Sequence, residues 1–209
     1  KDNEDIIRMC RRRIRVPDQW YGDYLSQLGA ARIGERRLKQ FTEKYGALRV
    51  RQFITDWFDY AERRALHAIQ KLPKGTLINR GTHDPVEPFL PEGVEITVKV
   101  EIDPEAGMVT VDLRDNPDCI DAGLNLTEAC ASANAIQGVF ENLEPDLPAN
   151  AGSFRRVNVR LRENCVVGIP RFPHCCSLAT TSIADVVVNL TQSAFTQLGD
   201  GYGMSQGNL

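Results

Sequence analysis

The stretch VEITVKVEIDPEAGMVTVDL, residues 94–113, decides the fold because apolar and polar side chains alternate along most of its length. Residues 94–102 and 108–113 each show the period of two that is typical of a β-strand with one buried face. The DPEAG segment between them has the composition of a turn. The sequence therefore predicts a pair of antiparallel strands, and a third strand is expected around Thr76–Arg80.

The residues before these strands have a helical pattern instead. Pro17 suits the first position of a helix, and apolar residues then recur at helical spacing until the chain reaches Gly46. A second apolar stripe runs over residues 47–72, with charged residues on the other face, and Pro73 ends it. The pattern predicts a helical hairpin region over residues 1–73.

Helices and strands alternate after the central strand pair. A helix is predicted over residues 126–143, a strand over 157–161 and a last helix over 178–198. Antiparallel strands that alternate with helices place residues 74–209 in the α+β fold class. The chain begins without Met and ends within the glycine-rich segment GDGYGMSQGNL, so we expect a fragment of a larger polypeptide, with the α+β region incomplete.

Composition argues against several classes of partner. The formal net charge of −3 argues against a nucleic acid or a membrane surface as the main partner, and the basic run Arg11–Arg15 is more typical of a solvated face or a subunit salt-bridge strip. No apolar run approaches the roughly 18 residues that a membrane helix needs. The 6 cysteines lack CxxC spacing and follow no signal sequence, which predicts a reduced, cytoplasmic protein without a zinc motif.

Polar residues gather in VDLRDNPDCIDAGLNL, residues 111–126. Alternation places Asp112 and Arg114 on one face of the strand, where a surface ion pair is worth less than about 1 kcal/mol. Asn125 stands three residues before Glu128, which is the signature of a helix N-cap, and the N–H groups of such a first turn also form an anion site. Local chemistry leaves open both a structural turn and a site for a polar substrate or cation.

A second polar segment is PANAGSFRRVNVRL, residues 148–161. Gly152 would allow a close backbone approach or a positive φ, and Arg155 and Arg156 could clamp a carboxylate or phosphate. The alternative is a helix-to-strand loop that is followed by a solvated edge.

Histidine and cysteine meet in sequence at His174, Cys175 and Cys176. A nucleophilic Cys–His pair needs two groups that face each other, and sequence neighbours seldom do. Small buried or loop thiols are therefore the favoured interpretation. The role of these cysteines stays open.

Taken in order, these segments resemble the B-type subunits of the hydantoinase and oxoprolinase family, which includes N-methylhydantoinase, 5-oxoprolinase and the acetone and acetophenone carboxylases. The similarity lies in the family's GD-x-x-AQ-x-AA and E-x-x-x-R-x-x-I-x-x-LPDG regions, its strand-turn motif VDFSGTSPQ-x-x-GPIN, its P-x-NAG and PEGSLLNPxxP motifs and the helix after them. The matching segments are residues 22–46, 62–76, 111–126, 147–173 and 179–187. LRDNPDC and CVVGIPRFPHCCS depart from the family's usual wording, which leaves the substrate open.

The resemblance implies an ATP-dependent cyclic amide hydrolase of the hydantoinase or oxoprolinase type. Such B-type subunits work in a hetero-oligomer with an A-type ATPase subunit, which binds the ATP and activates a lactam, imide or enol-type oxygen, or bicarbonate, by phosphorylation. A subunit of a ketone carboxylase and a non-catalytic assembly segment are the alternatives. The family's divalent-metal motif normally precedes the matched region, so this fragment alone is not expected to bind the metal or to turn over.

Six residues are expected to form the site in the complete enzyme. We expect Asp112, Asp115 and Asn125 to be catalytic, and Asn150, Gly152 and Arg155 to bind the substrate, with Arg155 as an anion clamp. Convergence of Asp112, Asn125 and Asn150 on one cleft would favour a catalytic subunit, whereas wide separation would favour an assembly role.

Overall fold

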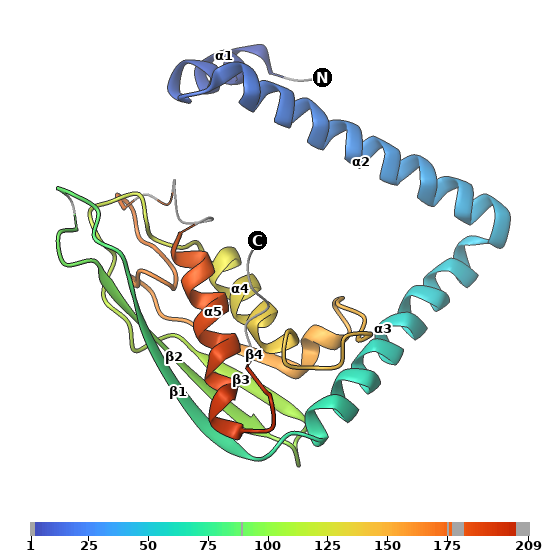
Figure 1. Cartoon of the computed structure of the whole chain (residues 1–209). Helices are drawn as coiled ribbons and strands as arrows, with labels where there is room; N and C mark the ends of the chain where they lie inside the picture. Colours follow the sequence, from blue (N-terminus) through green and yellow to red (C-terminus); the bar gives the residue numbers. More distant parts are fainter. Residues whose placement is uncertain (1–2, 89, 175, 177–181, 204–209) are drawn as a thin grey trace. The chain divides into compact units, whose positions relative to one another are not determined.

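The computed structural model describes residues 3–88, 90–174, 176 and 182–203 (Figure 1). The chain forms two compact units, Lys1–Thr55 and Asp56–Leu209. Within the described part of the chain, no helix is both long enough and apolar enough to cross a membrane.

The first unit is helical. It contains α1 (Glu4–Arg13), α2 (Pro17–Tyr45) and the first turns of α3 (Ala47–Gln70). The predicted helices on either side of Gly46 are confirmed, and Gly46 has a φ of 83°, in the left-handed region that favours glycine. Helix α1 is additional to the predicted hairpin, and the side chain of its N-cap Asn3 accepts hydrogen bonds from the first turn.

The second unit is built on a four-stranded sheet in the order β1-β2-β3-β4. The strands are β1 (Gly75–His83), β2 (Val94–Asp103), β3 (Met108–Asp112) and β4 (Val157–Arg160). The α+β class and the antiparallel pairing of β1, β2 and β3 are confirmed. The prediction of antiparallel strands is wrong for β4, which pairs with β3 in parallel. Helix α4 (Glu128–Phe140) lies between them in sequence and carries the chain back across the sheet, as a parallel connection requires.

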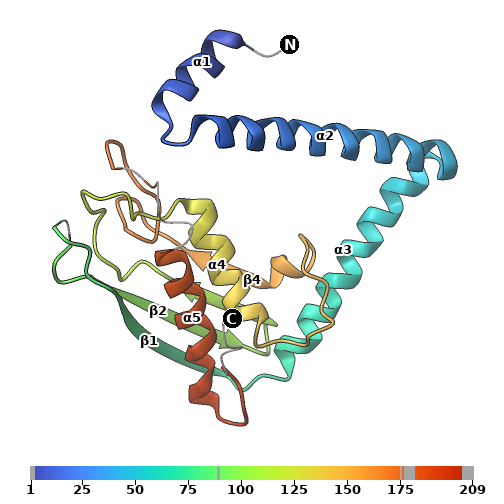
Figure 2. The ribbon, with the colours of Figure 1, turned by 45° about the horizontal axis from the view of Figure 1, so that its top comes forward.

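One face of the sheet makes the core. Helix α5 (Ile183–Ala194) packs on β1 and β2, and α4 packs on β3 and β4 (Figures 1 and 2). Each buried Val or Ile contributes about 1.5–3 kcal/mol, more than a surface ion pair, so the apolar face decides which side the helices cover. On β2 these core residues are Val94, Ile96, Val98, Val100 and Ile102.

The last predicted helix begins later than expected. Helix α5 starts at Ile183, and a short 3-10 helix, Phe195–Leu198, completes the predicted segment. Residues 178–181 lie outside the described part of the chain.

The second half of α3 belongs to the sheet unit. Its buried side chains begin at Ala61, and a Cβ atom on Gly152 would lie 2.0 Å from the Phe58 carbonyl oxygen. The close backbone approach predicted at Gly152 is therefore confirmed, whereas the alternative of a positive φ is wrong because φ is −71°.

We expect Gly152→Ala to destabilise the protein by about 1–3 kcal/mol, because the new methyl group overlaps the backbone of α3. Equilibrium urea unfolding measures the change. Gly75→Ala is the matched control, since a Cβ atom there would meet its nearest atoms at 3.8 and 3.9 Å. Equal losses in both variants would contradict the close approach.

Candidate functional site

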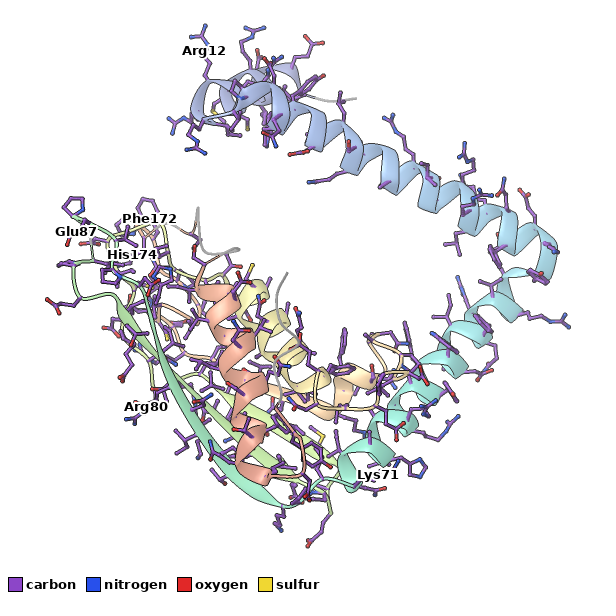
Figure 3. All side chains as sticks on the ribbon, viewed as in Figure 1. Arg12, Lys71, Arg80, Glu87, Phe172 and His174 are labelled. Carbon is purple, nitrogen blue, oxygen red and sulfur yellow. The ribbon has the colours of Figure 1, made fainter. Side chains whose placement is uncertain are left out.

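The carboxyl ends of the parallel strands β3 and β4 meet at one end of the sheet, where ligands commonly bind in sheets with parallel strands. Three loops lie there, residues 84–93, 113–127 and 161–174, and we call this region the loop end (Figures 1 and 2). Figure 3 shows Glu87, Phe172 and His174 at this end. Lys71 lies at the opposite end.

Asn116 lets the chain leave the sheet without losing backbone hydrogen bonds. Its side-chain oxygen accepts from the Thr97 N–H at 2.8 Å, and its amide nitrogen donates to the carbonyls of Thr97 at 2.8 Å and Leu113 at 2.9 Å. The side chain thus takes the place of a further residue of β3 beside β2. Asn116 is buried, although the sequence pattern predicts only a turn at this position.

Asn125 performs a similar task at the other end of the same loop. Its oxygen accepts from the Ile120 N–H at 2.9 Å, and its nitrogen donates to the carbonyls of Ile120 at 2.9 Å and Ala122 at 3.0 Å. The N-cap predicted for Asn125 is wrong. Thr127 caps α4 by accepting from the Cys130 N–H, and the Asn125 side chain instead turns back toward its own loop.

Arg162 joins two of the loops. Its guanidinium donates to the carbonyl oxygens of Arg114 at 2.9 Å and of Asn116, and it pairs with the Asp118 carboxylate at 2.8 Å. It also donates to the Asn164 carbonyl at 2.9 Å. No pattern in the sequence predicts this role, because Arg114, Asn116 and Asp118 all lie more than forty residues away along the chain.

Asp112 lies on the sheet face opposite the helices, on the same face as Arg114, as the alternation predicted. The Arg114 guanidinium approaches the carboxylate at 2.6 Å, and the Arg114 N–H donates to it at 3.0 Å. The hydrogen bond from the Arg114 side chain is the main cause that lowers the pKa of Asp112. Asp112 is therefore an ionised carboxylate that is already held by a cation at neutral pH.

Asp115 differs from its neighbours because its carboxylate is exposed and receives no hydrogen bond or ion pair from any described residue. Nearby in the sequence, the Asp121 carboxylate lies 3.3 Å from Nδ1 of His174, without the alignment of a hydrogen bond. The loop end thus carries an exposed carboxylate without a described partner at Asp115, and an Asp–His pair. Cys175 lies outside the described residues, and Cys176 is partly buried.

Asn150, Gly152 and Arg155 lie at the other end of β4. The Asn150 side chain accepts from the Gly152 N–H at 2.8 Å and closes a turn. The anion clamp expected at Arg155 has protein carboxylates as its partners, since Arg155 pairs with Asp59 at 3.1 Å and Glu62 at 2.8 Å on α3.

The structure thus brings only part of the expected set together. Asp112, Asp115 and Asn125 follow or end β3, whereas Asn150, Gly152 and Arg155 precede β4. The four residues of β4 separate the two groups by about 13 Å along the strand. The catalytic and substrate-binding roles of the six residues stay predictions.

The same described ranges also contain cysteines and possible metal ligands. Cys10, Cys119, Cys130 and Cys165 are free thiols there, and burial raises the pKa of Cys165. Nowhere in these ranges do three or more His, Cys, Asp or Glu side chains form a group that could hold a metal ion.

Comparison with known sequences gives a consistent set of relatives. The hydantoinase B/oxoprolinase family profile matches residues 1–207. The caprolactamase β subunit of Pseudomonas jessenii is 28% identical over 214 residues, which cover 98% of this chain and 35% of that subunit. The B-type subunit of a putative D-/L-hydantoinase from Pseudomonas sp. is 26% identical over 210 residues, which cover 94% of this chain and 34% of that subunit. An uncharacterized protein of Methanocaldococcus jannaschii is 26% identical over 190 residues, which cover 91% and 32%. The chain thus spans about a third of the length of these relatives.

Solved structures share the fold. The ATP-dependent caprolactamase of Pseudomonas jessenii superposes with a TM-score of 0.79 at 24% identity, over 97% of this chain and 34% of that one. Nucleotide-free acetone carboxylase superposes with a TM-score of 0.75 at 13% identity, over 95% of this chain and 27% of the acetone carboxylase chain. At these identities the superpositions establish the fold and nothing finer.

We expect Asn125→Asp to destabilise the protein by about 2 kcal/mol or more, because a carboxylate cannot donate to the Ile120 and Ala122 carbonyls and is itself buried. Thermal and urea unfolding measure the loss. Asn158→Asp, the same change at an exposed position of β4, is the control. A loss no larger than that of the control would contradict the role of Asn125 in the loop.

Acid should weaken the contact between α3 and residues 153–156. Hydrogen bonding from Arg155 is the main cause that lowers the pKa of Glu62 in the folded protein. Because the pKa of Glu62 is lower in the folded protein than in the unfolded chain, the ionised side chain stabilises the fold at pH values above the unfolded pKa of about 4.3. This stabilisation is lost as the pH falls through the folded pKa. The stability difference between the wild type and Glu62→Gln should therefore be largest near neutral pH and should shrink below about pH 4.

Urea unfolding at a series of pH values tests this dependence. Glu95→Gln provides the control, since Glu95 is exposed and its carboxylate contacts no described cation. A Glu62→Gln difference that stays constant from neutral to acid pH would rule out the ion-pair explanation.

Proposed function

Because this chain belongs to the hydantoinase B/oxoprolinase family, we propose that it is part of a B-type subunit that opens a cyclic amide or imide in an ATP-dependent enzyme. The names of two relatives, a caprolactamase β subunit and a putative hydantoinase B-type subunit, support this reaction class, since caprolactam and hydantoin are both cyclic amides. The caprolactamase structure is described as ATP-dependent. We place the enzyme in the cytoplasm, where ATP is available.

The partner in this proposal is an A-type ATPase subunit. ATP phosphorylates the amide oxygen, which makes the ring carbon electrophilic enough for water to add. The bond from this carbon to the ring nitrogen then breaks and the nitrogen takes up a proton, which opens the ring and leaves an acyl phosphate that a second water molecule hydrolyses to carboxylate and phosphate. The B-type subunit then needs to position water at the activated carbon and to stabilise the charge that develops. The described residues of this chain offer carboxylates and an Asp–His pair for that task, and no step is assigned to a metal.

The observation that carries the proposal is the position of the Asp115 carboxylate. Its carboxylate is exposed at the carboxyl end of β3, without a described partner, in a loop that Asn116 and Asn125 hold in place. A carboxylate in this position can accept the proton of an attacking water molecule. We assign Asp115 as the general base, and Asp112 and Asn125 as positioning residues, because protein groups already contact their polar atoms.

The substrate-binding role of Asn150, Gly152 and Arg155 has weaker support. Arg155 is paired with two carboxylates of α3, so it could bind an anionic substrate only by giving up those partners. We retain Arg155 as a substrate ligand only for a state of the complete enzyme in which α3 has moved.

A ketone carboxylase is the second candidate. Its support is the fold shared with acetone carboxylase at a TM-score of 0.75. Substrate preference separates the two reactions. A hydrolase should respond to lactams and hydantoins, whereas a carboxylase should respond to ketones with bicarbonate.

We expect the complete polypeptide, assembled with its co-encoded A-type subunit, to hydrolyse ATP faster when hydantoins, 5-oxoproline or small lactams are added. Phosphate release and ring opening are measured in parallel. Stimulation only by ketones with bicarbonate would favour the carboxylase. A lack of stimulation by every compound would overturn both reactions.

In the same assembly, Asp115→Asn should lower ring opening by about 100-fold or more, the usual contribution of a general base. The matched control is Asp146→Asn, because Asp146 is also an exposed aspartate and follows α4 at the far end of the sheet unit. Ring opening is measured at several pH values, because loss of a base also removes its limb from the pH profile. Equal activity of the two variants would remove Asp115 from the mechanism.

A further inference from the structure

The helices of the first unit expose an unusual amount of apolar surface. Between residues 3 and 55 no described residue is buried, although apolar side chains recur there at helical spacing. The exposed fractions of Phe41 and Phe53 are 56% and 64%. Helices owe most of their stability to the packing of such a face, so these helices need a partner.

A groove is the centre of this apolar surface. It lies at the bend around Gly46, has a volume of about 420 Å³, and is lined by side chains from α2 and the start of α3. We call it the elbow groove. Its lining residues are Leu38, Phe41, Tyr45, Arg49, Val50, Phe53 and Ile54.

A candidate side chain for this groove stands at the loop end of the sheet unit. Phe172 is 97% exposed, the highest exposure among the large apolar residues described (Figure 3). An aromatic side chain inserted in an apolar pocket is a common anchor of protein interfaces.

Charge selects what the elbow groove can bind. Residues 32–51, which surround the groove, contain 7 Lys and Arg and 2 Asp and Glu. The three loops of the loop end, residues 84–93, 113–127 and 161–174, contain 7 Asp and Glu and 3 Lys and Arg, and one of these is Arg171 beside Phe172. The same difference in charge separates the two units. Residues 1–55 contain 13 basic and 7 acidic residues, whereas residues 56–209 contain 12 basic and 21 acidic residues.

We propose that the elbow groove of one copy of this chain binds Phe172 and the acidic loops of a second copy. Opposite charges on the two surfaces favour this contact, whereas two basic elbow regions would repel each other. Two such contacts, one in each direction between the same two copies, would form a twofold dimer. This interface does not depend on which reaction the enzyme performs.

The contact must extend beyond one side chain. Specific interfaces bury about 1,200–2,000 Å², far more than a single phenylalanine provides. The exposed stripe of α2 and α3 and the acidic loops supply the remaining surface. Phe172 is the central anchor in this arrangement, and the charged residues form its rim.

Sedimentation velocity of the complete polypeptide over a range of concentrations tests the dimer. Phe172→Ala and Phe53→Glu should each raise the dimer dissociation constant at least about tenfold, as loss of a hot-spot contact does. Leu48→Glu and Ile78→Ala are the matched controls, because both residues are exposed but neither lines the groove. A monomer at all concentrations, or equal effects of test and control variants, would overturn the proposal.

Cross-linking identifies the surfaces directly. A photoreactive phenylalanine at position 172 is placed in an equimolar mixture of isotopically heavy and light protein. Cross-links from position 172 to residues 38–54 that join heavy to light chains would support the proposal. Cross-links only within one chain, or only to other segments, would overturn it. Because residue 172 is almost fully exposed, its replacement should leave the circular dichroism spectrum unchanged.

Discussion

The loop end depends on one constraint, which is that the peptide groups of residues 113–126 need hydrogen-bond partners. A loop pressed against a sheet loses water from its peptide groups, and each group left without a partner costs about 1–3 kcal/mol. Asn116 and Asn125 supply side-chain amides that mimic a peptide, with one donor group and one acceptor each. Arg162 then binds carbonyl oxygens from the same loop. With these contacts in place, the chain can leave β3, start α4 and return as β4.

The opposite end of the sheet unit depends on a different contact. Gly152 permits the backbone of α3 to approach closely, and the two arginines that follow it pair with carboxylates on that helix. Close approach and ion pairing act together there, because a helix held near the glycine brings Glu62 within reach of Arg155 and Arg156. A segment that reads as an anion clamp thus holds a helix.

This division assigns different tasks to the two ends. The loop end holds an exposed carboxylate, an Asp–His pair and an exposed aromatic side chain, whereas the α3 end uses its charges internally. Chemistry and assembly both need groups that other protein groups have not already bound. The loop end is therefore where we place the proposed general base and the proposed dimer contact.

The sequence by itself determined most of the local structure, although it missed α1 and placed the N-cap of α4 at Asn125 instead of Thr127. Alternation predicted β2 and β3, and helical spacing predicted α2 and α3. Pro17 and Gly46 marked the ends of α2, because each of these signals depends on neighbouring residues alone. Ordered motifs also identified the family. Tertiary structure decided the parallel pairing of β4 and the partners of Asn125, Arg155 and Arg162. An asparagine or arginine can bind any suitable group within reach, and only the folded chain determines which groups those are.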